Sequence, residues 1–152
     1  MATLNLVQYG DPVLRERARE VKKFNRNLHQ LLENMADTMY ENEGVGLAAP
    51  QVGISKRVVV LDVGDGLLEI VNPQIVEREG RSEDTEGCLS VPGRTGAVPR
   101  ATRIRVQACD RQGTPLVIEA EDLLSRALQH EIDHLDGVLI LDRFLPGSTE
   151  ST

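Results

Sequence analysis

The spacing of hydrophobic residues changes along the chain from a helical period to a strand period and back. Over residues 27–40 the apolar side chains recur at helical spacing and form one stripe, made of Leu28, Leu31, Leu32, Met35 and Met39. Four later segments are rich in β-branched residues or alternate apolar with polar positions, as strands do: residues 57–63, 68–79, 103–110 and 115–120. Helical spacing returns at residues 122–135 and ends at Gly137, a typical stop signal.

This order of elements predicts an α+β fold, with antiparallel strands packed around a central helix at residues 122–135 and another helix near the N-terminus. Asp11 and Pro12 favour a short helical turn, since aspartate caps helices and proline fits their first position. The polar stretch 80–100 is rich in glycine and proline and is interpreted as a loop that could contain a short strand. We expect one domain over residues 1–152, with a frayed, flexible tail at about residues 145–152.

The charge balance narrows the classes of protein to which the chain can belong. Seventeen Lys and Arg residues against 24 Asp and Glu residues give a net charge of −7, which argues against direct nucleic-acid binding. Two tyrosines and two phenylalanines are too few for a base-stacking platform. The chain has no signal-peptide pattern and no apolar run long enough to cross a membrane. We therefore expect a cytoplasmic protein, whose two cysteines remain thiols unless a metal or a reaction uses one.

The strongest chemical signal is the sequence HEIDH at residues 130–134. Two histidines four residues apart project from nearly the same side of a helix, so His130 and His134 can bind one metal ion. Glu131 is turned by about 100° and lies beside such a site. The histidine face also carries Leu123 and Ala127, so the imidazoles lie on an apolar face and need partners. Two hydrogen-bonded histidines in a protein core are the alternative interpretation.

A catalytic metal site of this kind usually has a third protein ligand. Downstream candidates are poor, because Ile140 occupies the position of the third metzincin histidine and the last glutamate is Glu150, in the tail. Upstream, His29 is interpreted as a surface residue. Cys88 is better placed, in a turn-prone stretch, and a thiolate is a strong ligand for zinc or ferrous iron. A small apolar core residue, or a disulfide with Cys109, are the alternatives for this cysteine.

The third unusual stretch is GVGLAAPQ at residues 44–51. Its two glycines allow the backbone to approach a ligand closely, and its small side chains keep that surface flat. An ordinary turn after the first helix is the alternative interpretation.

Three stretches, in this order, closely resemble the peptide deformylase family: GVGLAAPQ at residues 44–51, EGCLS at residues 86–90 and QHEIDHLDG at residues 129–137. The resemblance extends over roughly residues 5–145. It implies a metallohydrolase that removes the N-terminal formyl group from formyl-methionyl nascent polypeptides and releases formate. Such enzymes use one divalent metal, usually Fe²⁺, for which Zn²⁺, Ni²⁺ or Co²⁺ can substitute.

The resemblance also implies a role for individual residues. Cys88, His130 and His134 would be the metal ligands, with water in the fourth position. Glu131 would act as general acid and base. The backbone N–H of Leu89 and the side-chain amide of Gln51 would stabilise the oxyanion. Substrate-binding roles would fall to five residues: Val45, Gly46, Glu86, Leu123 and Ala127.

Of these substrate-binding residues, Gly46 would offer the substrate a backbone hydrogen-bonding edge. The methionine side chain would enter an apolar pocket beside Val45, Leu123, Ala127 and His130, near Glu86.

The implied partners are formyl-methionyl peptides of nascent chains, with the ribosome close by. Many relatives end in a basic helix that docks on the ribosome, whereas residues 146–152 contain no basic residue, so we expect weak association through this end. Two other functions remain as alternatives. One is a different metal-dependent amidase or peptidase, and the other is a binding module with a structural metal site, which would need a fourth protein ligand.

Overall fold

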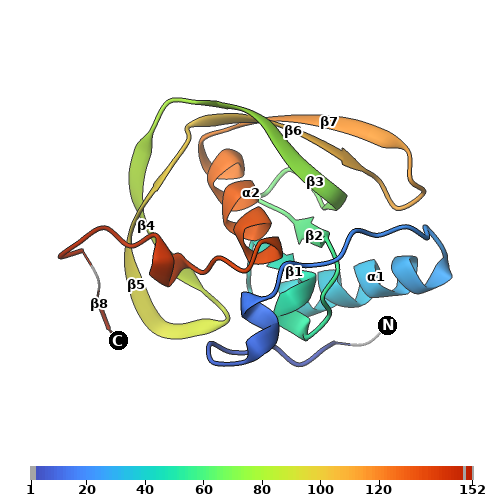
Figure 1. The fold of residues 1–152 in the computed structure, drawn as a ribbon, viewed down its shortest axis with the longest axis horizontal. Helices are drawn as coiled ribbons and strands as arrows, with labels where there is room; N and C mark the ends of the chain where they lie inside the picture. Colours follow the sequence, from blue (N-terminus) through green and yellow to red (C-terminus); the bar gives the residue numbers. More distant parts are fainter. Residues whose placement is uncertain (1–2, 149, 152) are drawn as a thin grey trace.

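The computed structural model describes residues 3–148 and 150–151 of the chain (Figure 1). Two α-helices and several antiparallel strands confirm the predicted α+β class. The helices are α1 (Arg26–Glu41) and α2 (Asp122–Leu135), which agree with the predicted segments to within a residue. Three short 3₁₀ helices complete the helical elements of the described residues: η1 (Pro12–Arg15), η2 (Ala49–Val52) and η3 (Ile140–Asp142).

The strands form two antiparallel sheets. The larger sheet has the order β1-β2-β3-β6-β7, which leaves one edge of β1 without a strand partner among the described residues. Its strands are β1 (Gly46–Ala48), β2 (Val58–Leu61), β3 (Leu68–Glu79), β6 (Arg103–Cys109) and β7 (Pro115–Glu121). The smaller sheet has the order β4-β5-β8, with β4 (Ser82–Cys88), β5 (Val91–Arg100) and β8 (Glu150–Ser151).

The two helices bury the apolar stripes that the sequence predicts. The side chain of Asn25 caps α1 by accepting a hydrogen bond from the Leu28 N–H at 3.2 Å. Met35 and Met39 of α1 are fully buried in the cluster that α1 forms with β2. On α2, Leu128 and Leu135 lie in the cluster that contacts the larger sheet. Figure 1 shows α2 with the larger sheet on one side and the β4–β5 ribbon on the other.

The prediction of a loop at residues 80–100 is wrong, because this stretch is the β4–β5 hairpin. Its register runs from Ser82 opposite Arg100 to Cys88 opposite Val91. The hairpin escapes a pattern-based prediction because several of its inward positions are polar or lack a side chain. Gly96 illustrates this, since a Cβ atom there would lie 2.6 Å from the ring of Phe144. The hairpin carries Cys88 to the C-terminal end of α2.

The predicted frayed tail is attached to the smaller sheet where the structure describes it. The Leu145 N–H donates to the Ala97 carbonyl at 2.9 Å, and the Ala97 N–H donates to Ser148 Oγ at 3.1 Å. Strand β8 then pairs with Arg94 and Thr95 of β5. Positions 149 and 152 of the predicted tail lie outside the described residues. Within the described part of the chain, neither helix is long and apolar enough to span a membrane.

Candidate metal centre

Helix α2 and the end of β4 bring three metal-binding side chains together. His130 and His134 lie one turn apart on α2, with ring centroids 5.1 Å from each other. Cys88 Sγ lies 3.3 Å from His134 Nε2. The ligand atoms of the three side chains all lie within 4.8 Å of one another, and no other such group of three occurs among residues 3–148 and 150–151. The predicted ligand set is therefore assembled in space.

The donor chemistry of this group fits one divalent ion. A thiolate and two imidazoles suit zinc, ferrous iron and related metals. His130 Nδ1 lies 3.0 Å from Glu86 Oε1, an arrangement that fixes the ring and leaves Nε2 available as a ligand. His134 Nε2 faces the sulfur, whereas its Nδ1 is buried without a hydrogen-bond partner in the described part of the chain. With three protein ligands, the set leaves a coordination position for water or substrate.

Glu86 connects His130 to a buried group of charges. Its carboxylate accepts hydrogen bonds from Arg100 at 2.9 and 3.0 Å and from Arg126 at 2.6 Å, in addition to facing His130. Burial alone would raise the pKa of Glu86, but its hydrogen bonds with His130 and Arg100 lower this pKa to about 2. Arg100 also bonds Asp133 of α2 at 2.6 Å. The negative charge that orients His130 is thus held by two arginines.

Glu131 lies beside the ligand set and differs from Glu86 in its surroundings. Its Oε1 is buried with no hydrogen-bond partner among the described residues. Burial raises the pKa of Glu131 to about 7, against the opposing effects of His130 and Arg100. A Cβ atom on Gly46 would lie 2.7 Å from Glu131 Oε2, so only glycine lets β1 pass this close to the carboxylate. The result is a carboxylate able to exchange a proton near neutral pH.

Gln51 is held in place from both ends of its amide. Its Oε1 accepts a hydrogen bond from the Ala48 N–H at 3.0 Å, within the turn that η2 makes after β1. Its Nε2 donates to Ser90 Oγ at 3.3 Å and faces Cys88 Sγ at 3.6 Å. The amide N–H₂ group is therefore directed toward the candidate metal ligands.

A cavity of about 460 Å³ opens beside these side chains. Every predicted catalytic and substrate-binding residue lines it, together with the ligands Cys88 and His130: Val45, Gly46, Gln51, Glu86, Leu89, Leu123, Ala127 and Glu131. Val45 and Leu123 are about half exposed and form its apolar rim. Four further residues line the cavity that the sequence did not predict: Glu43, Thr85, Gly87 and Arg126. Arg126 could have been found, because it precedes His130 by one helical turn on the same face of α2.

Two alternative ligands lie elsewhere. His29 Nε2 faces the Arg111 carbonyl at 2.8 Å and does not belong to the group of three. Cys109 is a free thiol that packs against the α1 cluster. Cys88 is also a free thiol, so the alternative of a disulfide between them is wrong.

Comparison with known proteins places this architecture in a family. The polypeptide deformylase family profile matches residues 3–149. The chain is 57% identical to the peptide deformylase of Pelotomaculum thermopropionicum, over 94% of this chain and 92% of the relative. It is 58% identical to that of Desulfitobacterium hafniense, over 94% and 95%. The crystal structure of peptide deformylase from Thermotoga maritima superimposes with a TM-score of 0.93 at 46% identity, covering 95% of this chain and 99% of that one. The chain belongs to the polypeptide deformylase family.

Proposed function

We propose that this hydrolase removes the formyl group from formyl-methionyl nascent polypeptides at the centre formed by Cys88, His130 and His134. The observation that carries the proposal is the convergence of these three ligands beside Glu131, a buried carboxylate without a hydrogen-bond partner among the described residues. From the resemblance to the family, we further propose Fe²⁺ as the native metal. Zn²⁺, Ni²⁺ or Co²⁺ could substitute, because a thiolate and two imidazoles accept all four ions. A divalent ion held there supplies a Lewis acid and lowers the pKa of water toward neutrality.

Glu131 is the proposed proton carrier. Its pKa of about 7 lets it take a proton from the attacking water and later give it to the amine that leaves. The carboxylate is already desolvated, since its Oε1 is buried. General acid–base catalysis of this kind contributes about 10²–10⁴-fold to the rate.

Two donors are proposed to stabilise the negative charge on the formyl oxygen. Gln51 Nε2 is fixed by the Ala48 N–H bond to its own Oε1, so its direction costs no reorganisation during the reaction. The second donor is the backbone N–H of Leu89, which follows Cys88 directly. Loss of one such donor typically lowers kcat by about 10²–10³-fold.

The substrate chain is proposed to lie along the open edge of β1. Gly46 begins this strand, and β1 is an edge strand of the larger sheet, so its backbone can pair with an extended peptide. The methionine side chain would enter the cavity between Val45, Leu123 and Ala127, next to His130. Glu86 lines the same cavity, but its oxygens are occupied by Arg100, Arg126 and His130, so we assign it to the support of His130.

We also propose that residues 1–152 act as one catalytic domain organised around α2, which carries both histidines. Nascent chains as substrates imply work in the cytoplasm near the ribosome. Ribosome co-sedimentation tests this association.

The test measures formate release from a formyl-Met peptide by protein loaded anaerobically with Fe²⁺ or Ni²⁺. We expect turnover with the formyl peptide and not with its acetyl analogue, which another amidase would also cleave. Glu131→Ala should keep the metal, measured by elemental analysis, and lose at least about 10²-fold in kcat. Glu119→Ala, on an exposed strand, is the matched control and should keep full activity. No formate from metal-loaded protein would overturn the proposal, and metal loss in Glu131→Ala would remove Glu131 from its role.

A further inference from the structure

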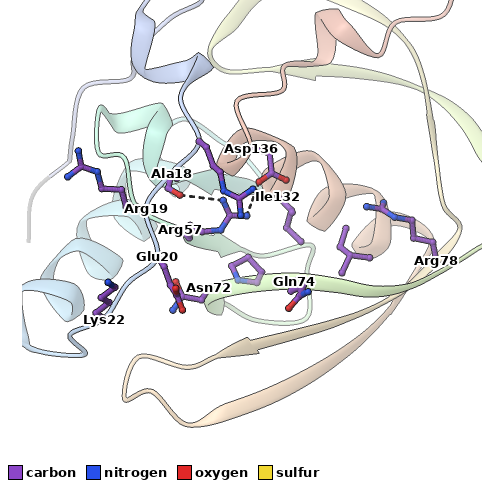
Figure 2. A pocket seen from close by; sticks show the side chains of 13 residues that line it. Ala18, Arg19, Glu20, Lys22, Arg57, Asn72, Gln74, Arg78, Ile132 and Asp136 are labelled. Atoms are coloured by element: carbon purple, nitrogen blue, oxygen red, sulfur yellow. Dashed lines mark hydrogen bonds and ion pairs between the residues drawn. The ribbon is translucent and has the colours of Figure 1, made fainter.

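A second cavity lies on the far side of α2 from the candidate metal centre (Figure 2). Its volume is about 1090 Å³. At about 100° per residue, Ile132 lies on the side of α2 roughly opposite to Ala127 and His130. The other walls are residues 17–20, Lys22, Arg57 before β2, and part of β3. One helix therefore separates two cavities that open on different faces of the molecule.

The second cavity is rich in positive charge. Five cationic side chains line it and together form what we call the basic trough: Arg17, Arg19, Lys22, Arg57 and Arg78. The acidic side chains that line it are Glu20 and Asp136, and Asp136 is already paired with Arg57 at 2.9 Å. The other four cations have neither a side-chain hydrogen bond nor an ion pair within the described part of the chain. This local excess of three positive charges lies on a chain whose net charge is −7.

The backbone that presents these cations is fixed at several points. Asn72 accepts a hydrogen bond from the Val21 N–H at 2.8 Å and donates one to the Val21 carbonyl at 2.9 Å. The Ala18 N–H donates to the Leu135 carbonyl of α2 at 2.8 Å, and the Arg57 N–H donates to the Arg19 carbonyl at 2.9 Å. Ala18 and Val21 are buried. The neighbouring cationic side chains are left exposed on an anchored segment, so a ligand need not order the backbone when it binds.

We propose that the basic trough binds the phosphodiester backbone of single-stranded RNA. Unpaired arginines and lysine that remain in solvent are the groups that replace counterions along a phosphate chain. Figure 2 shows Arg19 and Lys22 on one side of the trough and Arg78 on the other, so the cations flank an extended ligand and do not converge on one small anion. No aromatic side chain lines the trough, so base stacking is absent and binding is independent of sequence.

The overall negative charge does not oppose this interaction strongly. At physiological salt the screening length is about 8 Å, so acidic residues on distant surfaces contribute little in the trough. The sequence-based expectation of no nucleic-acid binding used the net charge of the whole chain and the small number of aromatic residues. Binding to a phosphate backbone depends instead on the local charge and does not need a stacking platform. Because α2 separates the two cavities, RNA in the trough leaves the metal centre accessible to a peptide.

The test uses fluorescence anisotropy of the full metal-loaded chain with a labelled single-stranded RNA of mixed sequence. With four unpaired cations engaged, the affinity should fall roughly 50-fold between 50 and 200 mM salt. The variant Arg17→Gln/Arg19→Gln/Lys22→Gln should bind about 10-fold more weakly or worse, with a shallower salt dependence. Formate release from a free formyl-Met peptide should be unchanged in this variant and unchanged by saturating RNA.

The control variant Arg81→Gln/Arg94→Gln/Arg105→Gln removes the same total charge outside the trough and should keep the RNA affinity. Equal loss in both triple variants, or no binding by the parent chain, would overturn the proposal. Binding of inorganic phosphate or of anionic lipid vesicles, without binding of RNA, would assign the trough to another ligand and overturn it as well. Each of these results is read independently of formate release, so it leaves the proposed enzymatic function intact.

Discussion

The molecule contains two clusters of arginine and carboxylate that are similar in chemistry and opposite in surroundings. The first lies around Glu86, whose side chain is 6% exposed, with Arg100 at 3% and Arg126 at 11%. The second runs across β3, β6 and β7, where Arg103 and Arg105 pair with glutamates such as Glu119; all of these side chains are more than a third exposed. We call them the Glu86 cluster and the surface ladder.

The two clusters differ mainly in how much stability is lost when one partner of an ion pair is removed. In water, a lost partner is replaced by solvent, so exposed pairs contribute little. In the interior, the charge that remains has no solvent, and breaking a buried pair costs about 3–5 kcal/mol. The Glu86 cluster also ends on a candidate metal ligand, His130, so its integrity matters for chemistry as well as for stability.

The largest effect is expected for Glu86→Gln. The substitution keeps the shape and removes the charge that faces Arg100 and Arg126, so the free energy of unfolding should fall by about 3–5 kcal/mol. Because Glu86 also orients His130, metal affinity should fall by about 10–100-fold. Urea unfolding and competition with a chelator measure the two effects. Unchanged metal affinity would show that Glu86 does not support the ligand.

Acid should remove the advantage that Glu86 provides. The pKa of Glu86 is lowered from its ordinary value of 4.5 to about 2, so its contribution is complete above about pH 4.5 and disappears as the pH falls toward 2. The shift corresponds to about 3 kcal/mol. The difference in unfolding free energy between the parent chain and Glu86→Gln, measured on chelator-treated protein at pH 6 and pH 3, should therefore shrink in acid. A constant difference would contradict the assignment.

A smaller loss of stability is expected for Arg143→Gln, which lies between the buried Glu86 cluster and the solvent. Arg143 bonds Asp133 at 2.9 and 3.0 Å but is 45% exposed, and Asp133 keeps Arg100 as a second partner. Arg143→Gln should therefore reduce the unfolding free energy by only about 1 kcal/mol, without loss of metal. Arg94→Gln, an exposed β5 position, is the control and should change neither quantity.

The smallest effect is expected for Glu119→Gln in the surface ladder. It is the same chemical change as Glu86→Gln, made where solvent can replace the lost charge. The midpoint of urea unfolding should not shift beyond the reproducibility of the measurement. A shift comparable to that of Glu86→Gln would show that burial does not decide the contribution of these pairs.

The sequence was most informative where the spacing of apolar residues reflects which side of a helix or strand is buried. Both helices and the strand pattern of residues 103–110 follow from the spacing of apolar residues, and the placement of His130 beside Ala127 follows from the turn of α2. Cys88 could be suggested as a ligand from the chemistry of its thiol. Its convergence with His134 depends on the β4–β5 hairpin, which the polar and glycine-rich pattern of residues 80–100 concealed.

Features that depend on charges far apart in the chain were not predictable. Glu86 is 14 residues from Arg100 and 40 from Arg126, and no local spacing relates these residues. The basic trough was hidden for the same reason, because Arg17 and Arg78 meet around one cavity only after folding. The net charge is a sum over the whole chain, so it does not show where positive and negative side chains gather on the folded surface.

The close approach of β1 to Glu131 restricts how this enzyme can evolve. Any side chain at position 46 would overlap the carboxylate of Glu131, which is the proposed proton carrier. An inhibitor that contacts the Gly46 backbone would therefore bind a surface that changes little by mutation. Any larger residue at position 46 would displace the Glu131 carboxylate. Substitutions that reshape the cavity without touching Glu131 are available at its more exposed rim, for example at Val45 and Leu123.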